Sequence, residues 1–310
     1  MTTILITLPF FAVIACGFFA TRRKIINSEG RSGLNLFVYY FALPVLIFSL
    51  MAQADIRSEF QWTFVAAYLL VGLVLFIASL VVATLFFKID YDLRVVFASA
   101  CIYGNTGYLG LPFVVIAFGQ AASVPVVICT TVDLAVMLPL ASILLDFNKA
   151  SSGIPFAQVC RKIAHSIVKN PLLVAVALGV LFSLSGLEMP QVADRFFVLL
   201  GAAAAPCALF ALGSSLDEER AGFLQGEILT ISFIKLVIHP LLIFFAMFHL
   251  FSVSDIWARS AVIAAAMPVA VTVYVLAQQY KTYIGRTSAS ILISTIISVA
   301  TLAFVLNYIT

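Results

Sequence analysis

Charged residues are scarce in this chain. Asp, Glu, Lys and Arg make up 10% of its 310 residues, whereas hydrophobic residues make up 63%. Soluble domains carry about 25% charged residues, and a water-soluble core cannot take up this much apolar surface. The excess must face lipid, so the sequence predicts an all-α membrane protein.

Recognisable catalytic and metal-binding patterns are missing as well. The sequence has no HExxH, no GxSxG and no CxxC pair, and its net charge is only +3, with the basic residues lying between apolar runs. These absences argue against an enzyme, a metal site and a nucleic-acid partner. We expect no cofactor, and no disulfide either, because the five cysteines are scattered: Cys16, Cys101, Cys129, Cys160 and Cys207.

Long apolar runs dominate what is present. A helix needs about 20 mostly apolar residues to cross a bilayer. The first run has no basic residue before it and no small-residue cleavage pattern, so we interpret it as a span and not as a signal peptide. The chain should therefore be a multi-pass protein of the inner or plasma membrane. The ten predicted spans are 4–21, 33–52, 62–87, 94–117, 122–146, 170–186, 195–216, 226–251, 259–280 and 286–308.

Lys and Arg are distributed unevenly between the predicted loops. If the N-terminus is outside, 13 of them fall in cytoplasmic loops and 3 in external segments. Positive residues are enriched on the cytoplasmic side of membrane proteins. Both termini should therefore be extracytoplasmic.

Two motifs recur in the same order in the two halves of the chain. The pattern P-x-x-[IL]-F-x-L begins at Pro44 and again at Pro206, an offset of 162, and an Asp follows eleven residues after each Pro. Predicted spans four and nine begin with Arg94 and Arg259, at an offset of 165. Five spans in each half place the second half in the opposite orientation, which predicts an inverted repeat. Its parts are residues 1–148, a cytoplasmic linker at 149–168, and residues 169–310.

Predicted spans four and nine contain residues that break helices. Three glycines, an Asn and a Pro lie between Tyr103 and Pro112, and Pro268 lies at the matching position of span nine. Unwound backbone at membrane depth is tolerated only inside protein or beside a wet cavity. The free amides that start each second half-helix favour an anion such as a carboxylate. The candidate substrate-binding residues are Gly104, Asn105, Thr106, Gly107, Tyr108, Pro268 and Val269.

Three ionisable residues lie within predicted spans: Asp133, Lys235 and His239. A charge at the centre of a bilayer costs on the order of 2.5–3.5 kcal/mol, so each needs a reason to be there. Asp133 could pair with Lys235, or it could load and release a proton or a sodium ion. His239 shares a helix face with Lys235 and is interpreted as a hydrogen-bonded structural residue.

The chain resembles the auxin efflux carrier family, which includes plant carriers and many bacterial permeases. The resembling stretches are 35–44, 104–112, 169–173, 208–213 and 265–268. The resemblance implies two inverted five-helix repeats in which broken spans four and nine cross at midplane. It also implies that Asn105 contacts a substrate carboxylate and that Pro268 is the second crossing point. Where the plant carriers have a proline, this chain has Gly104, and residues 147–169 replace their long central loop.

These observations predict a secondary active transporter that moves a small organic anion by alternating access. A mono- or dicarboxylate is expected, and malonate is one candidate that the resemblance suggests. A transporter-like sensor or a channel for small anions is the alternative. The expected partners are membrane lipid and the substrate, and a homodimer is left open.

Overall fold

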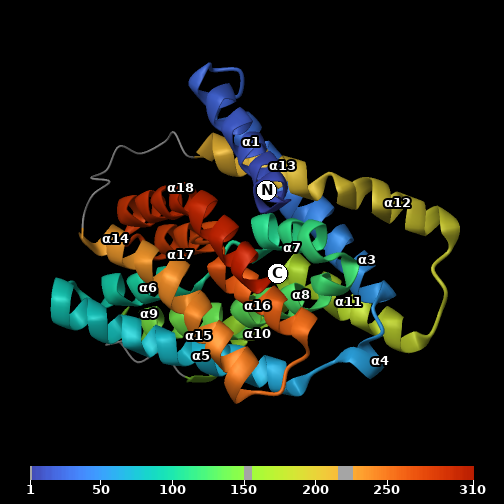
Figure 1. Ribbon diagram of the computed structural model, residues 1–310. Coiled ribbons are helices and arrows are strands. Elements are labelled where there is room, and N and C mark those ends of the chain that lie inside the picture. Colours follow the sequence, from blue (N-terminus) through green and yellow to red (C-terminus); the bar gives the residue numbers. More distant parts are fainter. Residues whose placement is uncertain (1, 150–155, 216–225) are drawn as a thin grey trace.

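The computed structural model describes residues 2–149, 156–215 and 226–310, and every regular element in these ranges is helical (Figure 1). Asp217 of the repeated motif and part of the predicted linker lie outside them. The elements are α1 (Thr2–Arg22), α2 (Ser28–Phe37), η1 (Val38–Ala42), α3 (Leu43–Gln53), α4 (Ile56–Glu59), α5 (Trp62–Val82), η2 (Ala83–Phe87), α6 (Tyr91–Ile102), η3 (Thr106–Gly110), α7 (Leu111–Phe118), η4 (Gln120–Ala122), α8 (Ser123–Val132), η5 (Asp133–Met137), α9 (Leu138–Lys149), α10 (Phe156–Lys169), α11 (Pro171–Ser185), α12 (Gln191–Ala202), α13 (Ala204–Ser215), α14 (Gly226–Phe233), η6 (Ile234–Ile238), α15 (His239–Phe245), η7 (Ala246–Leu250), α16 (Asp255–Ala266), α17 (Val271–Tyr280) and α18 (Ile284–Ile309).

Six helical stretches in the described ranges are long and apolar enough to cross a membrane. They coincide with predicted spans two, three, five, seven, eight and ten, so the prediction of an all-helical membrane protein is confirmed at this level. Five of them are built from two or more consecutive elements, and the sixth, Ile284–Ile309, is the single helix α18. The stretches are Ser28–Gln53, Trp62–Phe87, Gln120–Phe147, Gln191–Ser215, Gly226–Leu250 and Ile284–Ile309.

The other four predicted spans look different in the structure. Spans one and six correspond to α1 and α11, and α11 has only 15 residues. Span four is divided into α6 and η3–α7, with non-helical residues 103–105 between them. Span nine is divided in the same way into α16 and α17, with residues 267–270 between them.

The helices form two groups that lie side by side (Figure 1). One group contains α1, α2, α3, α11, α12 and α13, in which α1 packs on α13 and α3 packs on α11. The other contains α5, α6, α8, α9 and α14–α18. The segment η3–α7 packs against both groups, because it contacts α1 and α13 as well as α8 and α16.

Small residues allow the first group to pack closely. A side chain added at Gly17 of α1 would meet the Phe210 carbonyl of α13, and one added at Gly179 of α11 would lie 2.9 Å from the Phe48 carbonyl of α3. Backbones approach this closely in membranes mainly where glycine or another small residue removes the side chain. Glycine at these positions therefore fixes the distance between the packed helices.

Four helical turns with the wider π geometry precede prolines. The segments η1, η3, η5 and η6 each run directly into a helix whose second residue is Pro44, Pro112, Pro139 or Pro240. Proline lacks an amide hydrogen and its ring displaces the carbonyl four residues earlier, which opens the preceding turn. Such π turns often occur at functional sites, and three of these four contain predicted site residues.

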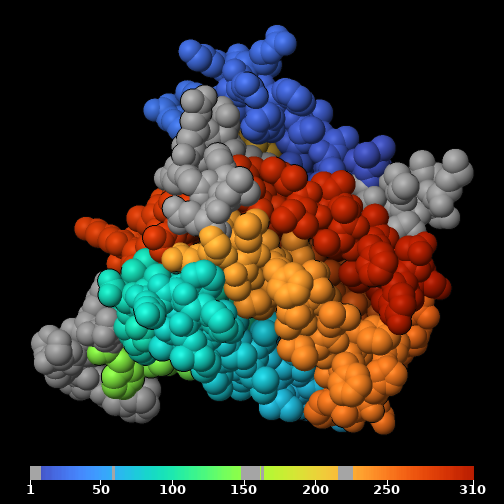
Figure 2. Space-filling model, turned by 60° about the vertical axis from the view of Figure 1, so that its left-hand side comes forward, coloured from blue at the N-terminus to red at the C-terminus, as the bar shows by residue number. Residues whose placement is uncertain are grey.

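Large apolar side chains are exposed on the outer helices. The face seen in Figure 2 is crossed by α5, α14–α15 and α18. These helices carry side chains that are more than half exposed, among them Ile77, Phe233, Phe245 and Phe304. An exposed apolar belt on helices of spanning length is typical of contact with lipid acyl chains.

Candidate functional site

Two short extended segments meet where the helices of predicted spans four and nine are interrupted. Gly104 and Val269 form an isolated antiparallel bridge. The amide of Asn105 donates to the carbonyl of Pro268 at 2.8 Å, and the amide of Ala270 donates to the carbonyl of Tyr103 at 3.0 Å. Asn105 and Pro268, which the sequence predicted to lie close together, are thus hydrogen-bonded. These bonds satisfy backbone groups that would otherwise be unpaired in the interior.

A serine of α18 supports the same junction. The amide of Val269 donates to Oγ of Ser294 at 3.0 Å, and Ser294 is fully buried. Sequence reasoning did not identify Ser294. The available signal was a polar residue in the interior of an apolar span, but that signal does not say which backbone group the hydroxyl binds.

Gly104 lies where no larger residue fits without a shift. A Cβ at this position would lie 2.8 Å from the Ala264 carbonyl oxygen and 3.2 Å from Nζ of Lys235. The glycine is therefore required by close approach of the two segments.

Asn105 presents an unused hydrogen-bond donor to the centre of the molecule. The residue is only 3% exposed, and its side-chain Nδ2 has no hydrogen-bond partner. A buried polar atom without a partner costs free energy of about 1–3 kcal/mol. An amide donor held in this way at the start of a helix is suited to an acceptor that arrives from outside, such as a carboxylate oxygen.

The residues after Asn105 line a polar, open region at the start of η3. The hydroxyls of Thr106 and Thr130 lie 2.9 Å apart. No atom lies within 4 Å of a Cβ built at Gly107, so there is open space beside this turn. The first amides of η3–α7 and α17 have no intrahelical acceptor, and they carry the positive end of each helix dipole.

Lys235 is completely buried and contacts the opposite side of the junction. Its Nζ donates to the carbonyl of Ala265 at 2.5 Å and lies 3.1 Å from Nδ1 of His239. If the ammonium donates to Nδ1, the hydrogen of the imidazole is on Nε2. Lys235 and His239, predicted to share one helix face, are in contact.

Asp133 lies in the interior but has a different neighbour. The residue is 8% exposed, and the Tyr68 hydroxyl lies 3.3 and 3.4 Å from its two carboxylate oxygens. Among the described residues, Asp133 and Lys235 do not form a direct ion pair. The structure therefore brings Lys235 to the junction, with His239 beside it, and buries Asp133 against Tyr68.

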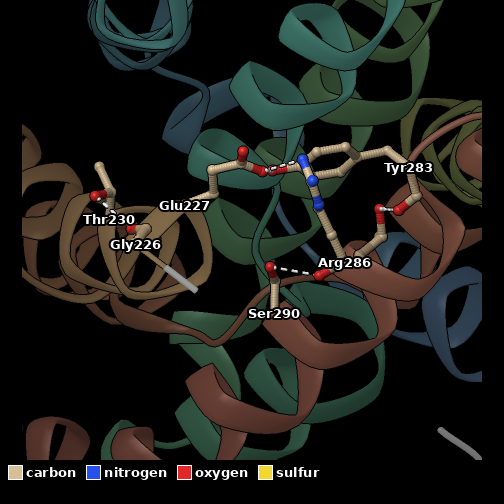
Figure 3. A network of polar contacts seen from close by, with 7 residues as sticks. Gly226, Glu227, Thr230, Tyr283, Arg286 and Ser290 are labelled. Carbon is tan, nitrogen blue, oxygen red and sulfur yellow. Dashed lines mark hydrogen bonds and ion pairs between the residues drawn. The ribbon is translucent and has the colours of Figure 1, made fainter. Parts of the chain in front are cut away.

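A second polar cluster connects α14 to the start of α18 (Figure 3). Glu227 accepts hydrogen bonds from the Tyr283 hydroxyl at 2.5 Å and from Nη1 of Arg286 at 2.6 Å. Burial and the hydrogen bond to Glu227 raise the pKa of the Tyr283 phenol above its ordinary value, so the hydroxyl stays protonated and donates. Sequence reasoning missed Glu227, because it stands at the boundary of a predicted span.

The junction is closed to solvent in this structure. Asn105 and Thr106 are each 3% exposed. A surface pocket of about 270 Å³ is lined by residues between Met247 and Asp255, and it contains none of the predicted substrate-binding residues.

Comparison with known proteins identifies the family. The model of the membrane transport protein family matches residues 3–306. The chain is 33% identical to a "Putative malonate transporter" of Rhizobium meliloti over 96% of this chain and 92% of that protein. It is 26% identical to "Uncharacterized transporter YfdV" of Escherichia coli over 93% and 91% of the two chains. It is 21% identical to "Auxin efflux carrier component 5" of Arabidopsis thaliana over 95% and 93%. The chain therefore belongs to the membrane transport protein family, to which the auxin efflux carriers also belong.

Proposed function

We propose that this protein is a secondary active transporter that moves a small carboxylate across the membrane by alternating access. The observation that carries the proposal is the buried, unpartnered Nδ2 of Asn105 at a junction of two interrupted helices. The full proposal includes ten membrane spans in two inverted repeats, with interrupted spans four and nine crossing at the substrate site. The repeats comprise residues 1–148 and 169–310.

Symmetric helix packing supports the inverted repeat. Gly17 of α1 packs on Phe210 and Ser214 of α13, whereas Gly179 of α11 packs on Phe48 and Ala52 of α3. Adding 162 to 17, 48 and 52 gives 179, 210 and 214, so each contact is the image of the other. The same offset separates Pro44 from Pro206. Matched contacts of this kind are expected when two repeats pack around a pseudo-twofold axis.

The contacts at the junction follow the offset of 165 residues that separates Arg94 from Arg259. Adding 165 to 104 gives 269, so the bridge joins Gly104 to its own repeat equivalent, Val269. The bond from Asn105 to Pro268 likewise maps onto the bond from Ala270 to Tyr103. A pair that maps onto itself lies on the axis that relates the two halves. This supports a crossing of the two interrupted spans at the centre of the repeat.

The electrostatics of the junction favour an anion. The starts of η3–α7 and α17 carry the positive ends of the helix dipoles, and Asn105 adds a side-chain donor. Binding roles are proposed for Gly104, Asn105, Thr106, Gly107, Tyr108, Pro268 and Val269. The name of the Rhizobium relative makes malonate the first substrate to test.

Alternating access, coupling and orientation complete the proposal. Because Asn105 is closed to solvent here, substrate must enter and leave through other conformations. Asp133 is the proposed carrier of a coupling proton or sodium ion, because it is a buried carboxylate within a predicted span. The excess of Lys and Arg in alternate loops supports extracytoplasmic termini in the cell membrane, and a homodimer is compatible with this arrangement.

Counterflow of labelled malonate into liposomes that contain the purified protein tests the proposal. The parent protein should accumulate label against unlabelled internal malonate, whereas Asn105→Ala should lose most of this exchange with normal expression and folding. The exposed Asn307→Ala is the matched control and should behave like the parent. Binding without counterflow would favour a sensor, and single-channel currents would favour a channel. A fully active Asn105→Ala would refute the assigned site.

A further inference from the structure

The interrupted helices also have carboxyl-terminal ends, and these ends have no role in binding an anion. The last carbonyls of α6 and α16 carry the negative ends of the helix dipoles. The capping amide of Tyr103 donates to the Ser99 carbonyl, and that of Met267 donates to the Ala264 carbonyl at 3.4 Å. The two ends approach each other at the junction, because the Ala264 carbonyl of α16 lies 2.8 Å from a Cβ built at Gly104. Carbonyl oxygens grouped in this way in a buried place favour a cation.

The amino group of Lys235 lies at these ends. Its Nζ donates to the Ala265 carbonyl at 2.5 Å and would lie 3.2 Å from a Cβ at Gly104. Ala265 is the second-last residue of α16, and Gly104 is the second residue after α6. The ammonium group therefore lies at the carboxyl-terminal end of α16 and beside Gly104, which follows the end of α6. The side chain of Lys235 is completely buried. Lys235 belongs to η6, which lies in the same predicted span as Glu227.

The first half of the chain has no equivalent of this lysine. Subtracting 162 or 165 from 235 gives Leu73 or Leu70 of α5, both apolar. The two bonds that the repeat relates at the junction, Asn105–Pro268 and Ala270–Tyr103, join backbone with backbone. The ammonium group of Lys235, which belongs to the second half only, thus lies at a junction that both halves form.

We propose that the carboxyl-terminal ends of the two interrupted helices form a binding site for a monovalent cation, and that the protein fills it with the tethered ammonium group of Lys235. The carbonyls of Ala264 and Ala265 would form one wall of the site, with His239 beside it. Occupation by Lys235 means that this position takes up no sodium or potassium ion from solution. Lys235 is then a positioning residue that holds the two helix ends together.

Chemical rescue tests this proposal. Lys235→Ala should empty the site, lower the Tm and reduce malonate counterflow by about tenfold or more, as expected when a buried partner is removed. Ammonium or methylammonium chloride should restore a large part of the lost Tm, because these cations fit the emptied space. Tetramethylammonium chloride at the same ionic strength should not restore it, because this cation is larger and has no hydrogen to donate.

Three controls make the result specific. The parent protein should show the same Tm in all three salts, because its site is already filled. Lys235→Met should be destabilised but not rescued by ammonium, because the methionine side chain occupies the space of the lysine stem. The exposed Lys169→Ala should behave like the parent.

The outcomes distinguish this inference from the proposed transport function. Only the counterflow measurement depends on the proposed transport function. The Tm measurements need no substrate, so they test the cation site even if malonate is not transported. Equal Tm values for Lys235→Ala in all salts, or equal rescue by tetramethylammonium, would overturn the inference. Failure to recover folded Lys235→Ala protein in any of the salts would also count against it, because ammonium should then have stabilised it.

Discussion

Replacing Gly104 with Ala is a direct test of the junction. The new Cβ would lie 2.8 Å from the Ala264 carbonyl oxygen, 3.2 Å from Nζ of Lys235 and 3.4 Å from Cβ of Met267. A carbon and a carbonyl oxygen normally stay about 3.3–3.6 Å apart. One of the two segments must therefore move by roughly 0.5 Å or more to restore that separation.

The size of the effect follows from what resists this movement. The Ala264 carbonyl belongs to the last turn of α16 and cannot turn away freely, and separating the segments weakens the bonds Asn105–Pro268 and Ala270–Tyr103. Overpacking costs about 1–3 kcal/mol, and a weakened buried hydrogen bond costs about 1 kcal/mol. We therefore expect a loss of about 2–3 kcal/mol in the free energy of unfolding. At about 2–4 °C per kcal/mol, Tm should fall by roughly 4–12 °C.

Gly107→Ala is the matched control. It lies three residues later in the same interrupted span, and nothing lies within 4 Å of the place that its new Cβ would take. It should leave Tm unchanged or raise it slightly, because Gly→Ala reduces the entropy of the unfolded chain by about 0.4–1 kcal/mol. Thermal unfolding of the detergent-solubilised proteins measures the difference. If Gly104→Ala is as stable as the parent, or if both variants lose equal stability, the junction does not have the described close approach.

Three further changes test other parts of the structure. Gly179→Leu should lower the free energy of unfolding by about 1–3 kcal/mol, because Met51 and the Phe48 carbonyl fill the space beside Gly179. Gly33→Leu is the control and should cause no such loss, because nothing lies close to Gly33. Equal losses for the two variants in thermal unfolding would contradict this prediction. A double-mutant cycle of Glu227→Gln and Tyr283→Phe should give a coupling of about 0.5–3 kcal/mol in denaturation experiments, and additive effects would show that their hydrogen bond does not contribute. If Asp133 carries a coupling proton, Asp133→Asn should abolish the dependence of malonate uptake on a pH gradient but leave malonate exchange intact. The exposed Glu188→Gln is the control. Uptake by Asp133→Asn that still depends on the pH gradient would reject the assignment.

Sequence reasoning located much of this arrangement because membrane helices obey simple length and composition rules. Six predicted spans agree with long apolar helices, and the glycines and prolines near Asn105 and Pro268 marked both interruptions. The cost of an intramembrane charge drew attention to Asp133, Lys235 and His239, all of which are buried.

The remaining features depend on contacts that apolar patterning does not encode. The π turns before Pro44, Pro139 and Pro240 were not predicted, although a proline within an apolar run was an available signal. Nothing in the sequence shows that Ser294 binds the amide of Val269, or that Lys235 contacts Ala265 instead of forming an ion pair with Asp133. Both facts depend on how neighbouring helices are rotated about their axes.

The bridge between Gly104 and Val269 has a consequence for how such a protein can diversify. Its two bonds join main-chain atoms, so a residue of similar size that keeps its amide hydrogen could replace the buried Val269 or Ala270 and the bonds would remain. Under the proposed function, substitutions could change the side chains beside the substrate site without breaking these main-chain bonds. A scaffold of this kind can acquire new cargoes through single substitutions, provided that the residue at position 104 stays small.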